Sequence, residues 1–252
     1  MLKKRLIFAL YFYNRNFCLS RNFDLQKVGA IDWIWENYDF DSIIKSIDEL
    51  MILNVGRGPI HEFAQFLGPL LSECLMPVTL GGGIASVADA AQLFETGADK
   101  VTLNRAIFED PALVEGIVGR YGAQSVVASI DYRENQNRVV YINSGKTKVD
   151  LAWTEIPKRL NDLGCGEILL NSIDRDGNGV GYDVGAAQSF SYAIDCPIIV
   201  SGGGETSTHL GDGLREVSID GVVTGSLFNF MCDGLRSARM QVRACGVDLA
   251  QW

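Results

Sequence analysis

Eight short apolar segments recur along this chain, separated by stretches long enough to form a helix. They are continuously apolar rather than alternating, which is typical of parallel strands buried on both faces. The segments are LIFAL from Leu6, LMILNV from Leu50, MPVTL from Met76, KVTLN from Lys100, SVVASI from Ser125, EILLNSI from Glu167, PIIVS from Pro197 and GVVTG from Gly221. This pattern predicts one (β/α)8 barrel (TIM barrel) domain over residues 1–252.

The stretches between the strands carry helix start and stop signals. Ser86 precedes a helical pattern that ends at Gly97, and Asp110-Pro111 opens another that ends near Gly122, matching N-cap, first-turn proline and C-terminal glycine preferences. Two connections are longer. Residues 11–37 follow the first strand, and residues 132–151 follow the fifth, where alternating polarity predicts a small hairpin. Both lie on the C-terminal face, where such barrels place their active sites.

Two strands end in the same tripeptide. Gly81-Gly82-Gly83 and Gly202-Gly203-Gly204 are 121 residues apart (202 − 81), as are Asn104 and Gly225 (225 − 104) on the strands that follow. Two strands repeating in register predict a duplicated half-barrel.

Composition excludes several classes of protein. With 252 residues, of which 47% are apolar and 21% charged, the chain can fill one large core. A net charge of −9 and the absence of a Lys/Arg-rich run argue against a nucleic-acid partner, because binding to the phosphate backbone needs clustered cations. We expect no membrane span, because no apolar segment is long enough.

The opening MLKKRLIFALYFY imitates a signal peptide, but its apolar run is short and polar residues follow from Asn14, so we expect a first buried strand. The six cysteines show no CxxC spacing, which favours a reducing cytoplasmic location. With only His61 and His209, we expect no metal site and no cofactor.

The two glycine loops can bind phosphate. Glycine exposes backbone N–H groups, and a following helix N-terminus adds positive potential. Duplication then predicts two sites, one at Gly83 and Asn104, the other at Gly203, Gly225 and Ser226, and hence a bisphosphorylated ligand. Either loop alone could simply be a tight turn.

Carboxylates follow the fifth and sixth strands. Asp131 ends SVVASID and can act as a general acid or base, or as a loop cap or ion-pair partner. Asp174 and Asp176 lie in LNSIDRDGNG, where an Asx turn is the default interpretation. The position equivalent to Asp131 in the first half, 120 residues earlier (131 − 11), is Tyr11.

Four charged residues stand at the starts of strands: Arg5, Glu49, Lys100 and Glu167. A closed barrel would bring them into a ring of alternating charge at its N-terminal end. Buried charges are costly unless paired, so geometry alone favours a structural ion-pair cluster.

Together these residues resemble the cyclase subunit of imidazole glycerol phosphate synthase, the HisF-type barrel of histidine biosynthesis. The resemblance covers nearly the whole chain. It rests on MLKKRLI, VTLGGGIASVADA, GADKVTLN, SVVASID, GEILLNSIDRDG, GYD and GSLF.

The resemblance assigns roles to residues of this chain. It implies that Gly83 and Asn104 bind one substrate phosphate, and that the other is bound by Asp176, Gly177, Gly203, Gly225 and Ser226. It also implies that the charged ring gates a passage for ammonia made by a class I glutaminase, which docks on the N-terminal face as a heterodimer. The resemblance thus favours a gate over a purely structural cluster.

The chain departs from the family pattern at the predicted active site. The family has a general-base aspartate where this chain has Tyr11, so only Asp131 remains of the catalytic pair. A phenol with a pKa near ~10 is a poor base at neutral pH. Asn54 replaces an aspartate, Arg105 replaces a threonine, and Leu19 stands near the place of a lysine.

Asn171, together with the loss of the aspartate at the position of Tyr11, resembles paralogues found with surface-polysaccharide genes, which are thought to pass ammonia to an amidotransferase that makes acetamidino sugars. We therefore expect a cyclase-like subunit that receives ammonia and supports amidination of a sugar intermediate. One alternative is a working cyclase of histidine biosynthesis, and another is a non-catalytic scaffold that activates a glutaminase.

Overall fold

The structure is a computed structural model, and it describes residues 3–30, 32–33, 36, 43–72, 74–134, 137–225 and 234–250. Within these ranges no helix is long and apolar enough to cross a membrane.

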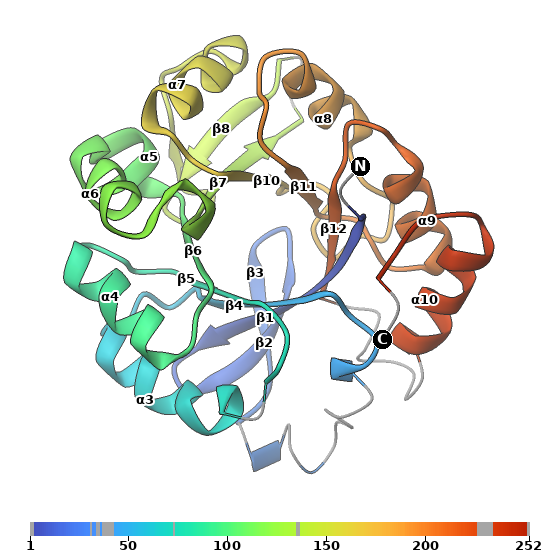
Figure 1. Cartoon of the computed structure of the whole chain (residues 1–252), viewed down its shortest axis with the longest axis horizontal. Helices are drawn as coiled ribbons and strands as arrows, with labels where there is room; N and C mark the ends of the chain where they lie inside the picture. The colour runs from blue at the N-terminus through green and yellow to red at the C-terminus, as the bar shows by residue number, and fades with distance from the viewer. Residues whose placement is uncertain are drawn as a thin grey trace.

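Eight parallel strands close into a barrel (Figure 1). In order around the barrel they are β1 (Arg5–Tyr13), β4 (Glu49–Asn54), β5 (Val78–Gly81), β6 (Lys100–Leu103), β7 (Val126–Arg133), β10 (Glu167–Ser172), β11 (Ile198–Ser201) and β12 (Gly221–Thr224). Parallel pairing of β12 with β1 closes the ring. Each strand comes from one of the eight apolar segments, so the predicted (β/α)8 barrel is confirmed.

Helices cover the outside of the barrel. They are α3 (Ile60–Leu71), α4 (Val87–Thr96), α5 (Arg105–Glu109), α6 (Pro111–Tyr121), α7 (Ile156–Leu163), α8 (Val184–Ser191), α9 (Ser207–Arg215) and α10 (Gly234–Ala244), with short 3-10 turns η1 (Ala123–Ser125) and η2 (Trp153–Glu155). The Ser86 hydroxyl accepts the Asp89 N–H at 3.1 Å, and Gly97 ends α4 with φ +116°. The predicted limits of α4 are therefore confirmed.

Two hairpins extend the sheet beyond the C-terminal ends of β1 and β7. The first hairpin is β2 (Asn16–Arg21) and β3 (Asp24–Gly29), where the sequence indicated only a long connection. The hairpin was not predicted because β3 is polar and mostly exposed and so lacks an apolar strand pattern. The second is β8 (Val139–Ile142) and β9 (Thr147–Lys148), as predicted. In Figure 1 the N-terminus lies near the viewer and β2 and β3 are paler, on the far side.

Apolar side chains fill two cores. The larger lies between strands and helices, and the smaller fills the inside of the barrel. The smaller core comprises Ile7, Ala9, Met51, Val127, Leu169, Ile199 and Val223. It separates the two polar ends of the barrel.

Backbone conformation shows the half-barrel duplication and corrects its register at the glycine loops. Gly82 and Gly202 have φ of +93° and +94°, and Gly83 and Gly203 have +84° and +95°, so equivalent glycines are 120 residues apart (202 − 82). The expected offset of 121 is wrong here, because repeated glycine letters cannot distinguish neighbouring registers. The offset of 121 does hold for Asp99 and Asp220 (220 − 99). Their carboxylates accept hydrogen bonds from the N–H groups of Val78 and Ile198, which begin equivalent strands.

Candidate active site

A pocket of about 360 Å³ opens on the C-terminal face of the barrel. The ends of the first six barrel strands and their loops line it. The polar side chains at this pocket are Tyr11, Ser20, Asn54, Arg57, Thr102, Asn104, Arg105, Ser129, Asp131, Ser144 and Asn171.

Asp131 is the buried acid of this pocket. Its carboxylate accepts hydrogen bonds from Ser129 Oγ at 3.1 Å and Asn171 Nδ2 at 3.2 Å. Burial raises the pKa of Asp131 to about 6, against the opposing effects of these two donors and of the Arg57 charge. A carboxyl group with this pKa can take up or release a proton near neutral pH.

We expect Asp131→Asn to stabilise the protein at neutral pH. Asp131 has a folded-state pKa above its ordinary value of 3.8, so ionising it costs stability as pH rises from about 4 to about 6. A shift of roughly two units corresponds to about 3 kcal/mol. The variant should gain up to this amount above pH 7 and almost nothing at pH 4. Urea unfolding across this pH range checks it; a variant less stable than the parent at pH 7 would contradict it.

Tyr11, near the C-terminal end of β1, lines the same pocket as Asp131. Burial raises the pKa of the Tyr11 phenol well above its ordinary value, and the charges of Asp176 and Asp131 add to this effect, while a hydrogen bond with Ser201 opposes it. The phenol therefore stays protonated at neutral pH and can donate a hydrogen bond. A phenol in this state is a poor general base.

One end of the pocket is cationic. Gly83 and Asn104 lie here as expected, together with Arg105 and with Arg57, which sequence reasoning missed. Arg57 stands between Gly56 and Gly58, in the loop that follows β4, a position that could have indicated a residue at the barrel mouth. The Asn104 amide donates to the Ser129 carbonyl at 3.1 Å.

A second, separate pocket of about 40 Å³ lies on the other side of Tyr11, and its lining includes Gly203, Gly225, Asp176 and Gly177. The Asp176 carboxylate is already engaged, because it accepts Ser20 Oγ at 2.5 Å and the Phe23 N–H at 3.0 Å. Tyr11 lines both pockets and so lies between them. Ser226, also expected here, is outside the described residues.

Gly177 and Gly225 are closely surrounded by other parts of the chain, so a larger side chain would not fit easily at either position. Gly177 has φ +65° and packs against the Ser20 carbonyl, so it serves a close approach between the loop after β10 and the β2–β3 hairpin. A Cβ on Gly225 would meet the Tyr11 ring at 3.4 Å. The Tyr11 ring therefore occupies space beside this second expected phosphate site.

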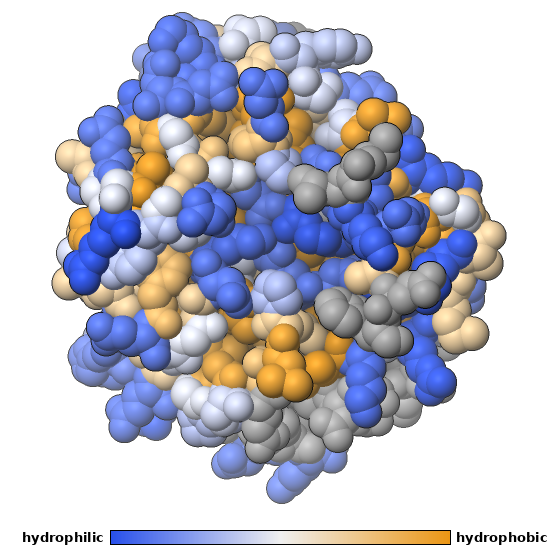
Figure 2. Space-filling view, viewed as in Figure 1, coloured by the Kyte–Doolittle hydropathy of each residue, from blue (hydrophilic) through white to orange (hydrophobic). Residues whose placement is uncertain are grey.

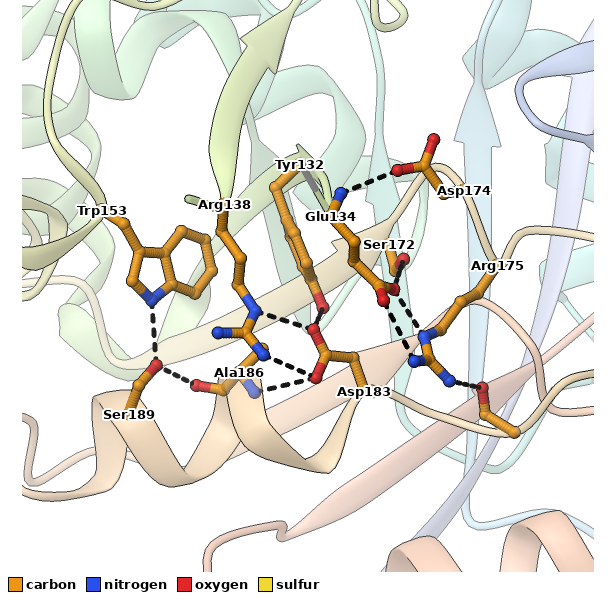
Figure 3. A network of polar contacts seen from close by, with 11 residues as sticks. Tyr132, Glu134, Arg138, Trp153, Ser172, Asp174, Arg175, Asp183, Ala186 and Ser189 are labelled. Carbon is orange, nitrogen blue, oxygen red and sulfur yellow. Dashed lines mark hydrogen bonds and ion pairs between the residues drawn. The ribbon is translucent and has the colours of Figure 1, made fainter. Parts of the chain in front are cut away.

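A polar network holds the loops after β7 and β10 (Figure 3). Asp183 accepts two hydrogen bonds from Arg138, both at 2.8 Å, and one from the Tyr132 hydroxyl at 3.1 Å. Arg175 pairs with Glu134 and donates to the Gly181 carbonyl. Because Tyr132 directly follows Asp131, this network fixes the end of the strand that carries the pocket acid.

Asp174 has a structural role in the same network. Its carboxylate accepts the Glu134 N–H at 2.7 Å and the Arg133 guanidinium at 2.9 Å, consistent with the default expectation of a loop-forming residue. No three His, Cys, Asp or Glu side chains in the described ranges come together as a group that could hold a metal ion.

The four charged residues form a closed ring at the N-terminal end of the barrel. Lys100 Nζ lies 2.9 Å from Glu49 and 2.8 Å from Glu167, and Arg5 pairs with both glutamates, 3.0 Å from Glu49. Both glutamates are buried. Burial would raise the pKa of Glu167, but Arg5 and Lys100 together hold it below its ordinary value. The sequence thus placed all four members correctly.

Comparison with known proteins gives consistent results. A family model described as histidine biosynthesis protein matches residues 47–231. A Parasynechococcus marenigrum (strain WH8102) protein with the provisional name imidazole glycerol phosphate synthase subunit hisF2 is 43% identical over 100% of this chain and 95% of its own length.

Two further relatives are named imidazole glycerol phosphate synthase subunit HisF. That of Chlorobium limicola is 39% identical over 80% of this chain and 82% of its own length. That of Chlorobium phaeobacteroides is 34% identical over 99% of each chain. The chain therefore belongs to the HisF family of histidine biosynthesis proteins, whose named members here are subunits of imidazole glycerol phosphate synthase.

Proposed function

We propose that this chain is the ammonia-accepting subunit of a glutamine amidotransferase system. A class I glutaminase binds the N-terminal face, and its ammonia passes the charged ring and reaches the pocket that contains Asp131. The observation that carries this proposal is the combination of a complete ring with a protonated phenol at the position of the family base. All four charged residues of the proposed ammonia route are present, whereas only Asp131 remains of the acid–base pair that an ordinary cyclase uses.

The N-terminal face has the features of a docking surface. Leu75, Tyr192 and Val217 are 97%, 93% and 87% exposed, and each lies in a loop that leads from a helix into a barrel strand, on the same side as the charged ring. A partner that covers these three side chains would remove apolar surface from water and so gain binding free energy. Figure 2, which looks onto this face, shows hydrophilic residues over its middle and hydrophobic ones beside them.

Thr102 supports a route between the ring and the pocket. It follows Lys100 by two residues on β6, so both side chains face the same side of the strand. Its hydroxyl is buried without a hydrogen-bond partner among the described residues, and Thr102 lines the pocket. A buried hydroxyl with free hydrogen-bonding capacity is a suitable transient partner for ammonia.

The acceptor that we propose is a phosphorylated sugar intermediate of surface-polysaccharide synthesis, amidinated with the help of a separate sugar amidotransferase. The support is the resemblance of the Tyr11 and Asn171 pattern to the polysaccharide-associated paralogues. A second candidate is a working cyclase, favoured by the names of the relatives. The third is a scaffold that only activates its glutaminase.

The test is an assay of the purified chain with a class I glutaminase. We expect a 1:1 complex and glutamine hydrolysis that depends on the chain. Because burial of a large exposed apolar side chain favours association and burial of an unpaired carboxylate opposes it, Leu75→Asp should weaken the complex by roughly tenfold or more. Val180→Asp is the matched control, since Val180 is 59% exposed but lies after β10 on the opposite face. Equal affinity of the parent and Leu75→Asp would contradict the docking surface.

The products separate the three functions. Delivery of ammonia to the pocket with no formation of imidazole glycerol phosphate supports the amidination role. Formation of imidazole glycerol phosphate at an ordinary rate supports the cyclase. Activated glutaminase with all its ammonia lost to solvent supports the scaffold.

A further inference from the structure

The two ends of the pocket region, which the half-barrel duplication would make equivalent, differ in charge. Arg57 and Arg105 line the large pocket at the Gly83 end. At the Gly203 end, Asp176 and Glu205 line the small pocket, and no Lys or Arg does so among its described residues. A phosphate would meet cations at one end and carboxylates at the other.

Two arginines, Arg57 and Arg105, line the pocket at the Gly83 end and repel each other, and the charges of Asp131 and Glu109 oppose this repulsion, each more weakly. Burial is the largest cause that lowers the pKa of Arg57, and repulsion from the Arg105 charge is the second largest. The acidic partner of Arg105 is Glu109 at 3.7 Å, an ion pair about half exposed to solvent on both sides, and such a pair contributes little. Converging guanidinium groups are unfavourable unless an anion lies between them, and phosphate suits their planar arrangement of donors.

Arg57 is held in place before any ligand arrives. Its NH1 donates to Asn143 Oδ1 at 2.7 Å and its NH2 to Ser144 Oγ at 3.2 Å. Both acceptors are neutral, so they orient the guanidinium without cancelling its charge. Arg57 also has φ +52°, a strained conformation for a residue other than glycine, of the kind concentrated at binding sites.

The Gly203 end is small and already filled. Its volume of about 40 Å³ compares with about 360 Å³ for the main pocket. The Glu205 carboxylate lies against Gly179, where an added Cβ would overlap it. The Tyr11 ring packs beside Gly225. Space and charge both disfavour a second phosphate.

We propose that the ligand of this chain carries a single phosphoryl group, bound between Arg57 and Arg105, and presents an uncharged, hydroxyl-bearing part to Tyr11 and Asp131. This assignment rests on the proposed function, since it describes the acceptor that would meet ammonia at Asp131. It replaces the expected symmetric bisphosphate with a sugar monophosphate or a similar polyol phosphate. Arg57 and Arg105 are then the residues that set specificity.

Titration calorimetry with inorganic phosphate tests the number and place of the sites. We expect one phosphate per chain. Arg57→Gln and Arg105→Thr should each weaken binding by roughly tenfold or more, as expected for loss of a charge-assisted hydrogen bond. Arg120→Gln is the control, because Arg120 lies on the far part of α6, over the Tyr121 ring. Thermal unfolding of each variant verifies that it folds.

A matched pair of sugars tests the asymmetry. Fructose 6-phosphate and fructose 1,6-bisphosphate should bind with affinities within about tenfold, since the second phosphate finds no cationic site. Two equivalent phosphates per chain, a hundredfold preference for the bisphosphate, or phosphate binding unaffected by both arginine substitutions would each overturn the proposal.

These measurements need no glutaminase, so they separate the two proposals. A chain that binds one phosphate at the arginines but accepts no glutaminase retains this site and loses the proposed function. A crystal soaked in phosphate supplies the position directly. Density between Arg57 and Arg105 supports the proposal, and density only at Gly203 overturns it.

Discussion

The unaltered chain, supplied with ammonium salt and the bisphosphate substrate of the synthase, should form imidazole glycerol phosphate about 10²–10⁴-fold more slowly than the Chlorobium limicola HisF subunit. This is the usual cost of losing one proton-transfer group. Tyr11 stands where the resemblance places the base, and its phenol remains protonated because burial and two neighbouring carboxylates disfavour the phenolate. Free ammonia makes the result independent of the charged ring and of any glutaminase.

Two substitutions at Tyr11 refine this experiment. Tyr11→Phe keeps the ring and removes the hydroxyl, so an unchanged residual rate would show that the phenol has no part in the remaining turnover. Tyr11→Asp restores a carboxylate but places it near Asp131 and Asp176, where like charges raise its pKa and lower stability. Turnover of the parent chain equal to that of the Chlorobium protein would contradict the prediction and restore the histidine-pathway alternative.

The barrel and its charged base could be predicted from sequence because both depend on short-range patterns. Continuous apolar runs specify strands buried on both faces, and all four ring residues sit at the starts of such runs. Ser86 and Gly97 likewise mark a helix by local chemistry alone. Parallel closure of the barrel then brings residues from four strands together without further information.

The asymmetry of the mouth could not be predicted in this way. Arg57 and Glu205 lie in loops, and whether a loop side chain points into the pocket depends on tertiary packing rather than on periodicity. Arg57 is positioned by a turn about 86 residues later in the chain. Glu205 follows a glycine loop that resembles its duplicate in letters but carries a different charge. Repeated motifs therefore predicted equivalent sites where the surroundings are opposite.

Lys100→Met should destabilise the protein by roughly 3–5 kcal/mol, because it leaves the two buried glutamates sharing Arg5 alone. Adding Glu167→Gln should recover part of this loss. The double variant retains a balanced pair, Arg5 with Glu49 at 3.0 Å, and Glu49 still accepts the Thr79 hydroxyl at 2.6 Å. Unfolding free energies of both single variants and the double variant give the coupling directly.

Lys158→Met is the matched control for this substitution. Lys158 pairs with Asp162 on the surface of α7, with both side chains mostly exposed, so its loss should change stability by less than about 0.5 kcal/mol. In complex with a glutaminase, the double variant should lose ammonia to solvent while remaining folded, because the ring no longer presents four charges to the arriving ammonia. Ammonia transfer that stays as efficient as in the parent would assign the ring to structure alone, and the difference between Lys100→Met and Lys158→Met would then measure only the cost of unpairing a buried charge.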